Sequence, residues 1–274
     1  MADSIHRIVK IAFLCLLLFV LPIARADDAL FFGNSFTNRI PSIVTDIAKS
    51  KGKDLATKGI IKNGQDLGAH LAGHGADDAL KSKSWATVVL QDLSLNPTHA
   101  RDSKKFMNYG DRFYDKIVQN APGATIVLYE TWAYSAQHYF ITGGPDPKLK
   151  LDGVEDAPPA KGPTPKFASA DEMYGEIHAS YAALQVALQA KDAKRKILIA
   201  PVGTAFAQCI KDHPKINLYI KDLKHPSAAG NYLAACVLYA TITGDNPVGA
   251  ESKGVPDADA KILQEIATAL VLKK

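Results

Sequence analysis

This sequence has few cysteines and only a small excess of positive over negative charge. The 274 residues include three cysteines, Cys15, Cys209 and Cys236, too few for a small disulfide-stapled scaffold. Lysines and arginines number 32 against 28 aspartates and glutamates, so the net charge is only +4. No run of lysines and arginines is suited to binding along the phosphate backbone of a nucleic acid, so we expect no nucleic-acid partner.

The common metal and cofactor motifs are also missing. The sequence has no H-E-x-x-H, no cysteine pair at zinc spacing, no G-x-x-x-x-G-K-[ST], no G-x-G-x-x-G and no G-x-S-x-G. We therefore expect neither a metal nor a cofactor. His70 and His74 have the spacing of a shared metal site, but no third ligand accompanies them, and we expect them on a solvated helix face.

The first 26 residues have the pattern of an export signal. Arg7 and Lys10 precede an apolar run of 13 residues, Ile11 to Ile23, and Ala24-Arg25-Ala26 resembles a cleavage site. A membrane anchor would need about 20 apolar residues, so we expect no stable anchor. The sequence predicts a periplasmic or secreted protein whose mature chain begins at about Asp27.

The mature chain retains Cys209 and Cys236. An oxidising compartment would permit a disulfide between them, provided that their Cα atoms lie within about 7 Å. Two buried thiols on separate helices are an equally open alternative. Residues 27–274 have an ordinary globular composition, 47% hydrophobic and 22% charged over the whole chain, and we expect one domain.

Short apolar runs alternate with amphipathic stretches along this domain. Continuous apolar runs suit strands of a parallel sheet that are buried on both faces, and strand-helix alternation is typical of a doubly wound α/β domain. The expected strands are Ala29–Phe32, Leu55–Ile61, Thr87–Leu90, Thr125–Tyr129 and Ile197–Val202. The expected helices are Ile40–Lys51, Asp66–Lys81, Ser103–Asn120, Ala170–Lys191, Pro226–Thr243 and Asp257–Leu272.

Residues 135–169 interrupt this alternation after the fourth expected strand. The segment is rich in glycine and proline and poor in apolar residues. Because it follows the carboxyl end of a strand, where such sheets bind ligands, we expect a lid or substrate-binding loop. A surface excursion without a role in binding is the alternative.

Ser35 follows directly after the first expected strand, in Gly33-Asn34-Ser35-Phe36-Thr37. A serine at a strand-to-helix turn projects its hydroxyl above the sheet edge, near the positive end of the following helix. This position suits a nucleophile. The structural alternative is that Ser35 caps the helix.

A serine nucleophile needs a base and an acid that orients the base. Among the histidines, His225 has an aspartate three residues earlier, in Asp222-Leu223-Lys224-His225-Pro226. Pro226 suits the first position of a helix, so Asp222 and His225 would share the turn before it. We expect the Asp222 carboxylate to reach Nδ1 of His225 while Nε2 faces Ser35. A surface ion pair is the bland alternative.

These residues resemble the SGNH branch of the GDSL-type esterases and lipases over about residues 28–248. That family has its nucleophile in a Gly-Asp/Asn-Ser motif after the first strand and an Asp-x-x-His-Pro motif near the C-terminus. The resemblance implies a three-layer α/β/α fold of the flavodoxin-like type with a five-stranded parallel sheet. It also implies a catalytic triad of Ser35, His225 and Asp222. The flanking segments Gly33–Thr37, Val88–Ser94, Tyr129–Tyr134 and His225–Tyr232 look like those of a secreted bacterial subgroup.

The family resemblance also implies an oxyanion hole, which would use the amides of Ser35 and Gly64. The family's Gly-x-Asn-Asp block is not present, and Gln91 stands where its asparagine would be. The Gln91 amide has the reach to donate the third hydrogen bond. The alternative is a buried glutamine that supports the backbone of the loop.

Three residues near the fourth strand are candidates for substrate contact: Trp132, Tyr134 and His138. Aromatic rings at a strand end can form a pocket wall or stack on a sugar, although core packing is equally plausible. His99 is a further loop candidate. We expect a secreted serine esterase that cleaves acetyl or short acyl esters, possibly on carbohydrates. The alternatives are an envelope glycan O-acyltransferase with the same triad and a catalytically silent glycan-binding protein.

Overall fold

The computed structural model describes residues 28–73, 75–144 and 166–273. The expected export signal, His74 and most of the 135–169 insertion lie outside the described residues. Described parts of the insertion lie next to each other, because Thr142 N donates to Phe167 O at 2.8 Å and Phe167 N donates to Phe140 O at 2.8 Å.

Five parallel strands form one sheet in the order β2-β1-β3-β4-β5. The strands are β1 (Ala29–Gly33), β2 (Thr57–Ile61), β3 (Thr87–Leu90), β4 (Thr125–Tyr129) and β5 (Ile197–Ala200). In the pairing of β1 with β3 at the centre of the sheet, Phe32 lies opposite Leu90. The expected α/β class and the five-stranded parallel sheet are confirmed.

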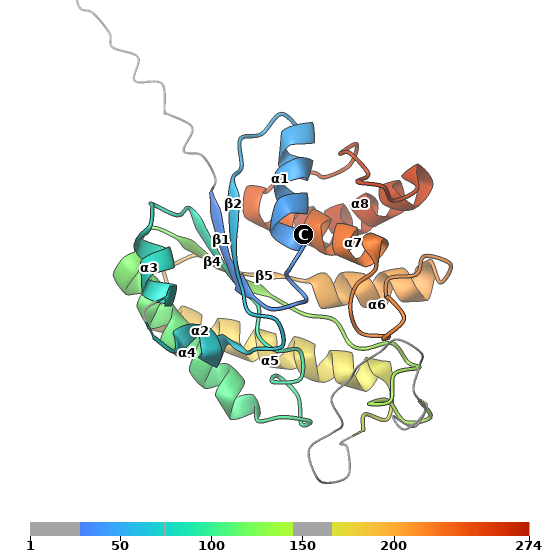
Figure 1. The fold of residues 1–274 in the computed structure, drawn as a ribbon, viewed down its shortest axis with the longest axis horizontal. Coiled ribbons are helices and arrows are strands. Elements are labelled where there is room, and N and C mark those ends of the chain that lie inside the picture. Colours follow the sequence, from blue (N-terminus) through green and yellow to red (C-terminus); the bar gives the residue numbers. More distant parts are fainter. Residues whose placement is uncertain (1–27, 74, 145–165, 274) are drawn as a thin grey trace, which may run out of the picture.

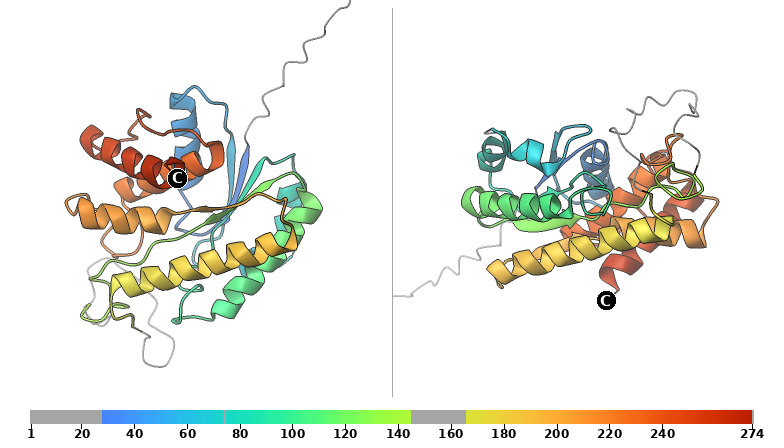
Figure 2. Two further views of the ribbon diagram at one scale, coloured as in Figure 1. Left: turned by 180° about the vertical axis from the view of Figure 1, so that it is seen from behind. Right: turned by 90° about the horizontal axis from the view of Figure 1, so that it is seen from below.

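The sheet is the middle one of three layers (Figures 1 and 2). Helices α2 (Leu67–Leu71), α3 (Gly75–Lys81), α4 (Ser103–Asn120) and α5 (Ala170–Lys191) cover one face. Helices α1 (Ile40–Ser50), α6 (Val202–Asp212), α7 (Ala228–Thr243) and α8 (Asp257–Leu272) cover the other. All five residues of β1 are buried, because β1 lies inside the sheet between both helix layers.

Strand β2 departs from the expectation of a strand buried on both faces. It is an edge strand that pairs with β1, and its residues are half-buried or exposed. Lys58 and Gly59 are the exposed members. A lysine in an edge strand keeps its ammonium in water and discourages pairing with another chain.

Two expected helix boundaries are wrong. The expected helix Asp66–Lys81 is two short helices, α2 and α3, because Gly73 takes a left-handed conformation (φ +74°) that ends helical geometry between them. The helix at the C-terminal motif begins at Ala228, and the Ser227 side chain caps it by accepting from Gly230 N at 3.1 Å. Pro226 therefore precedes the cap and is not the first helical residue.

Helix α6 was not expected. The apolar run that begins at Ile197 forms β5 and continues into this helix, so one hydrophobic stretch contains both the strand and the start of the helix.

Cys209 of α6 and Cys236 of α7 are both buried and free, which agrees with the alternative of separate thiols. Burial, assisted by Asp259 and Asp212, raises the pKa of the Cys209 thiol to about 11, so this cysteine stays protonated and unreactive near neutral pH.

Candidate active site

Ser35 lies in the turn between β1 and α1, with its side chain half-buried. Helix α1 begins only at Ile40, and its N-cap is Arg39, which makes no side-chain capping bond. Ser35 therefore does not cap the helix, and that alternative is wrong. Instead, the hydroxyl points toward the loop before α7.

Three side chains from the two ends of the domain meet at this point. Ser35 Oγ and His225 Nε2 are 2.9 Å apart, and His225 Nδ1 is hydrogen-bonded to Asp222 Oδ2. A carboxylate can only accept, so the imidazole donates from Nδ1, which leaves the Nε2 lone pair to accept from the Ser35 hydroxyl. The geometry is that of a nucleophile, a base and an orienting acid.

The Asp222 carboxylate also holds the loop that carries His225. Its Oδ1 accepts hydrogen bonds from Lys224 N (3.1 Å) and His225 N (2.9 Å). Burial alone would raise the pKa of Asp222, but the hydrogen bonds from the His225 ring and from these two amides outweigh burial and hold the pKa at about 2. Asp222 is therefore an anion near neutral pH.

Gln91 supports the turn that carries Ser35. Its Oε1 accepts from Asn34 N at 2.9 Å and from Thr37 Oγ1 at 2.8 Å, while its Nε2 donates to Asp92 O. The side chain is 1% exposed. These contacts match the alternative role of a buried glutamine that satisfies loop backbone.

The backbone amides of Ser35 and Gly64 have no hydrogen-bond acceptor among the described residues. Gly64 adopts a left-handed conformation (φ +69°) in the turn after β2. This turn lies against the Ser35 turn, because Asn34 Nδ2 donates to Gln65 O at 2.9 Å and Lys62 N donates to Gly33 O at 3.0 Å. Both amides are therefore available for a negative oxygen.

Gly33 has to be a glycine because the turn closes tightly over it. A Cβ at this position would lie 2.3 Å from Thr37 Oγ1 and 2.7 Å from Gln91 Oε1, both on buried side chains.

We expect Gly33→Ala to lower the free energy of unfolding by about 1–3 kcal/mol and to disturb the Ser35 turn. Urea unfolding measures the change in this free energy. Gly59→Ala is the control, because a Cβ there meets its nearest atoms only at 3.3 Å; equal losses in the two variants would contradict the argument.

His70 is a residue that sequence analysis misplaced. Its ring is 2% exposed rather than on a solvated face, and its Nε2 lies 3.0 Å from Gly33 O, to which it donates. Among the described residues Nδ1 has no hydrogen-bond partner, and burial lowers the pKa of the His70 ring, which favours the neutral form near pH 7. It fixes the end of β1 just before the Ser35 turn. A buried supporting histidine has no signature in sequence spacing.

The three candidate substrate contacts are buried. Trp132 is 0%, Tyr134 6% and His138 2% exposed, so none offers a free ring face to a sugar. Tyr134 shares a hydrogen bond with Ser94 Oγ at 2.8 Å. This burial favours the alternative of core packing, in which the rings at the end of a buried strand pack with one another. His99 is exposed and pairs with Glu176 at 2.7 Å.

Asp92 is a buried carboxylate that follows Gln91. It is 1% exposed and accepts from Leu67 N (2.9 Å), Leu93 N (2.7 Å) and the Asn96 amide (3.2 Å). Burial outweighs these hydrogen bonds and raises the pKa of Asp92 from 3.8 to about 6. Through its hydrogen bonds to Leu67 N and Leu93 N, Asp92 links the start of α2 to the loop after β3.

The raised pKa of Asp92 predicts a pH dependence of stability. The folded protein binds this proton more tightly than the unfolded chain, so stability falls as pH rises from about 4 to about 6. Over this range the wild type should lose about 3 kcal/mol of unfolding free energy through Asp92, because each pKa unit corresponds to 1.36 kcal/mol. Asp92→Asn should not show this loss. Urea unfolding at pH 4, 5, 6 and 7 measures the difference between the two proteins. A difference that stays constant across this range would contradict the prediction.

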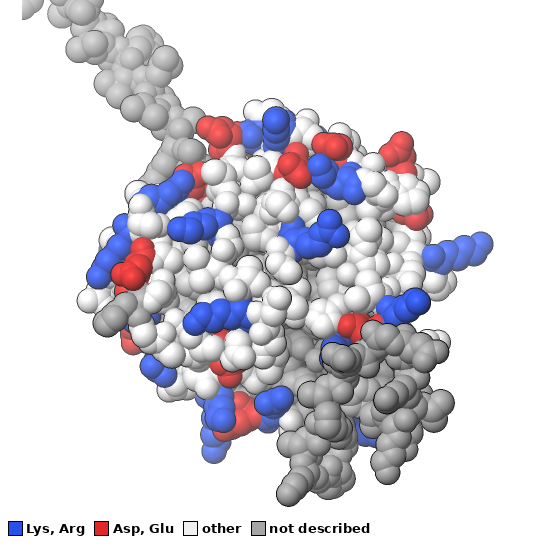
Figure 3. Space-filling view, viewed as in Figure 1, with Lys and Arg blue, Asp and Glu red and all other residues white. Residues whose placement is uncertain are grey.

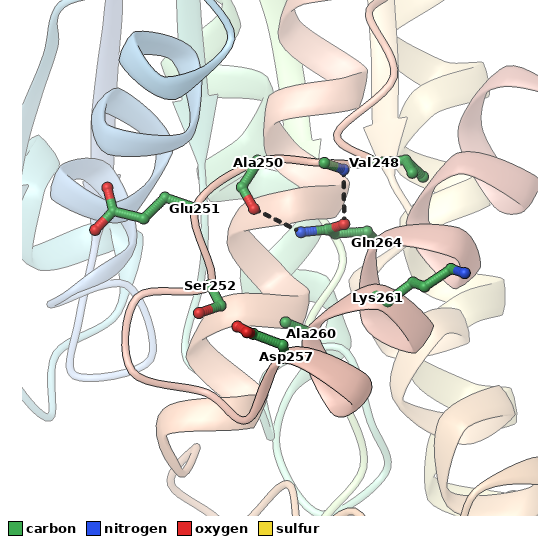
Figure 4. Close-up of a pocket in the computed structure, with 9 residues that line it drawn as sticks. Val248, Ala250, Glu251, Ser252, Asp257, Ala260, Lys261 and Gln264 are labelled. Atoms are coloured by element: carbon green, nitrogen blue, oxygen red, sulfur yellow. Dashed lines mark hydrogen bonds between the residues drawn. The ribbon is translucent and has the colours of Figure 1, made fainter.

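A separate hollow lies between the loop before α8 and α8 itself (Figure 4). Gln264 crosses it, accepting from Gly249 N at 2.9 Å and donating to Ala250 O at 3.0 Å and to the Tyr232 hydroxyl at 2.7 Å. Its amide is thus already bonded within the protein. Neither Ser35 nor His225 lines this hollow.

Within residues 28–73, 75–144 and 166–273, no group of three or more histidine, cysteine, aspartate or glutamate side chains is arranged to hold a metal ion. In the same part of the chain, every helix is too short or too polar to cross a bilayer.

The sequence matches no family model and no curated protein. Solved structures do resemble it. A DUF4886 family protein from Bacteroides uniformis has a TM-score of 0.65 at 17% identity, covering 90% of this chain and 95% of its own.

A putative GDSL-like lipase from Parabacteroides merdae has a TM-score of 0.52 at 16% identity, covering 80% of this chain and 96% of its own. The acetyl xylan esterase AlAXEase has a TM-score of 0.51 at 18% identity, covering 78% and 98%. At these identities the likeness is one of fold.

Proposed function

We propose, starting from an SGNH hydrolase fold, that the protein is a serine esterase in which Ser35, His225 and Asp222 form the catalytic triad. One observation carries this proposal: Ser35 Oγ lies 2.9 Å from His225 Nε2 while Nδ1 of the same ring is bonded to Asp222. A chance ion pair would not place a serine hydroxyl on the opposite ring nitrogen. This chemistry needs no metal and no cofactor.

Acylation begins when Ser35 Oγ attacks the carbonyl carbon of the ester and His225 Nε2 takes the hydroxyl proton. The carbonyl oxygen becomes negative and accepts hydrogen bonds from the amides of Ser35 and Gly64. When the tetrahedral intermediate collapses, His225 returns the proton to the departing alcohol oxygen. Asp222 stabilises the imidazolium that exists between these two steps.

Deacylation repeats the sequence with water in place of Ser35. His225 removes a proton from water, the resulting hydroxide attacks the acyl carbon, and the imidazolium then protonates the departing Ser35 oxygen. The carboxylic acid leaves, and the free serine is restored. If a sugar hydroxyl replaced water, the same groups would transfer the acyl chain.

Most exposed side chains of the loops next to the Ser35 turn are polar, which favours a polar alcohol such as a sugar over a lipid. The exposed residues of these loops are Asn38, Arg39, Lys62, Asn63, Gly64, Gln65, Ile220 and Lys221, and Ile220 is the one large apolar side chain among them. Basic and acidic side chains are intermingled on the face shown in Figure 3. We propose acetyl or short acyl esters of carbohydrates as the substrate class; one protein of similar fold is an acetyl xylan esterase.

We further propose that residues 1–26 are removed during export and that the mature enzyme acts in the periplasm or outside the cell. Sequencing the N-terminus of the protein recovered from an expressing bacterium tests this, with Asp27 as the expected first residue. Recovery of an intact Met1 terminus from the extracellular fraction would contradict cleavage.

The function itself is tested with purified mature protein and 4-nitrophenyl acetate, followed by a panel of acetylated oligosaccharides. We expect turnover of both kinds of ester. Acylated sugar formed only when an acceptor is added would indicate a transferase. Absence of turnover together with retained glycan binding would indicate a silent binding protein.

A further inference from the structure

Trp132 is a fully buried side chain beside the proposed active site. Its ring is 0% exposed and lies between two other rings. The ring of Phe36 stacks on one face (centroids 4.6 Å apart, planes 4° apart), and that of Phe206 stacks on the other (4.3 Å and 5°). Because Phe36 directly follows Ser35 in the chain, Trp132 is in contact with the turn that carries the proposed nucleophile.

The same indole reaches the loop that carries the proposed base. Trp132 Nε1 donates to Lys224 O at 2.9 Å, one residue before His225. Close by, Ser135 N donates to Leu223 O at 2.9 Å. The segment after β4 thus supplies two hydrogen bonds to the 222–225 loop.

This loop needs anchoring because it has no helix or strand of its own. Leu223 adopts a left-handed conformation (φ 64°), which costs energy for a residue with a branched side chain. The Asp222 side chain organises the loop internally, but its bonds to His225 lie within the loop and cannot fix the loop relative to Ser35.

We propose that Trp132 is a positioning residue that sets the distance between His225 and Ser35. Its ring fixes Phe36 and its N–H fixes the Lys224 carbonyl, so one rigid side chain joins the two halves of the triad. The inference rests on the esterase function proposed above. A displacement of about 1 Å between reacting groups can lower a rate about 100-fold, so a single anchor can matter.

Trp132→Phe separates this role from ordinary core packing. The phenyl ring keeps the stack between Phe36 and Phe206 but has no N–H to donate. Trp85 provides a matched control, because it is the other tryptophan of the chain, is 3% exposed, and donates Nε1 to Ala79 O at 2.9 Å. Each phenylalanine variant removes one indole N–H from one buried backbone carbonyl.

The readouts are kcat and KM for 4-nitrophenyl acetate, together with the rate at which a fluorophosphonate labels Ser35. Both are measured below the unfolding temperature of each variant. We expect Trp132→Phe to lower kcat and the labelling rate about 10-fold or more, with KM changed less than about threefold. We expect Trp85→Phe to keep both rates near those of the wild type even if its melting temperature falls as far.

Two outcomes overturn the inference. If Trp132→Phe matches the wild type in kcat and labelling, its N–H does not position the base. If both tryptophan variants lose activity in proportion to their loss of stability, Trp132 acts only through packing. A wild-type protein that neither hydrolyses the ester nor reacts with the fluorophosphonate overturns the esterase proposal and this inference together.

Discussion

Replacing Ser35 with alanine should lower kcat for 4-nitrophenyl acetate by about 10⁴-fold or more. The hydroxyl is the only atom group lost, and its hydrogen bond to His225 Nε2 at 2.9 Å is the contact that activates it. Removing it leaves water as the sole nucleophile. The variant should remain folded, because the turn is held through Asn34, Thr37 and Gln91.

The measurement is initial-rate kinetics above the buffer blank, with mass spectrometry of protein quenched during turnover. Wild-type protein should carry one acetyl group, and Ser35→Ala should carry none. Ser42→Ala is the control, because Ser42 is an exposed serine of α1 whose hydroxyl donates to Arg39 O. Equal rates in wild type and Ser35→Ala would reject the proposed nucleophile, even if the protein hydrolyses esters.

The sequence predicted the secondary structure best where apolar residues lie on one face of a helix or form a continuous run in a strand. The helices Ser103–Asn120 and Asp257–Leu272 and the strand Thr125–Tyr129 have the expected limits, because an amphipathic stripe or a buried apolar run marks both of their ends. Helix α6 was missed because the apolar residues of β5 run into it without a polar break. Periodicity cannot separate a strand from a helix that follows directly.

The site was partly predictable for a different reason. Ser35 follows a strand and Asp222 and His225 share a short loop, so parallel-sheet topology alone brings them toward the same edge. The roles of Gln91 and Trp132 could not be read in this way, because they depend on which neighbours fill the same space. A polar or aromatic side chain near a strand end can face substrate or pack inward, and only tertiary contacts decide between these outcomes.

Asp222→Asn should have an effect of similar size to loss of the nucleophile, about 10⁴-fold in kcat. The two side chains have the same shape, so the carbonyl oxygen of the introduced amide can still accept from Lys224 N and His225 N. The amide nitrogen then takes the place of Oδ2 and faces His225 Nδ1, to which it donates. The imidazole is forced to carry its proton on Nε2, where it can no longer accept the proton of Ser35.

A second variant distinguishes this explanation from general damage to the loop. Hydrogen bonds hold the pKa of Asp222 at about 2, so the wild-type carboxylate is an anion in a neutral assay. Asp222→Ala removes the acceptors of Lys224 N and His225 N together with the contact to the ring, whereas asparagine keeps both backbone acceptors and changes only the ring contact. If the ring contact carries the effect, the two variants should be about equally slow, and Asp115→Asn, an exposed aspartate paired with Lys191, should keep the wild-type rate. An Asp222→Asn variant much faster than Asp222→Ala would indicate that Asp222 holds the loop and is not the partner of the base.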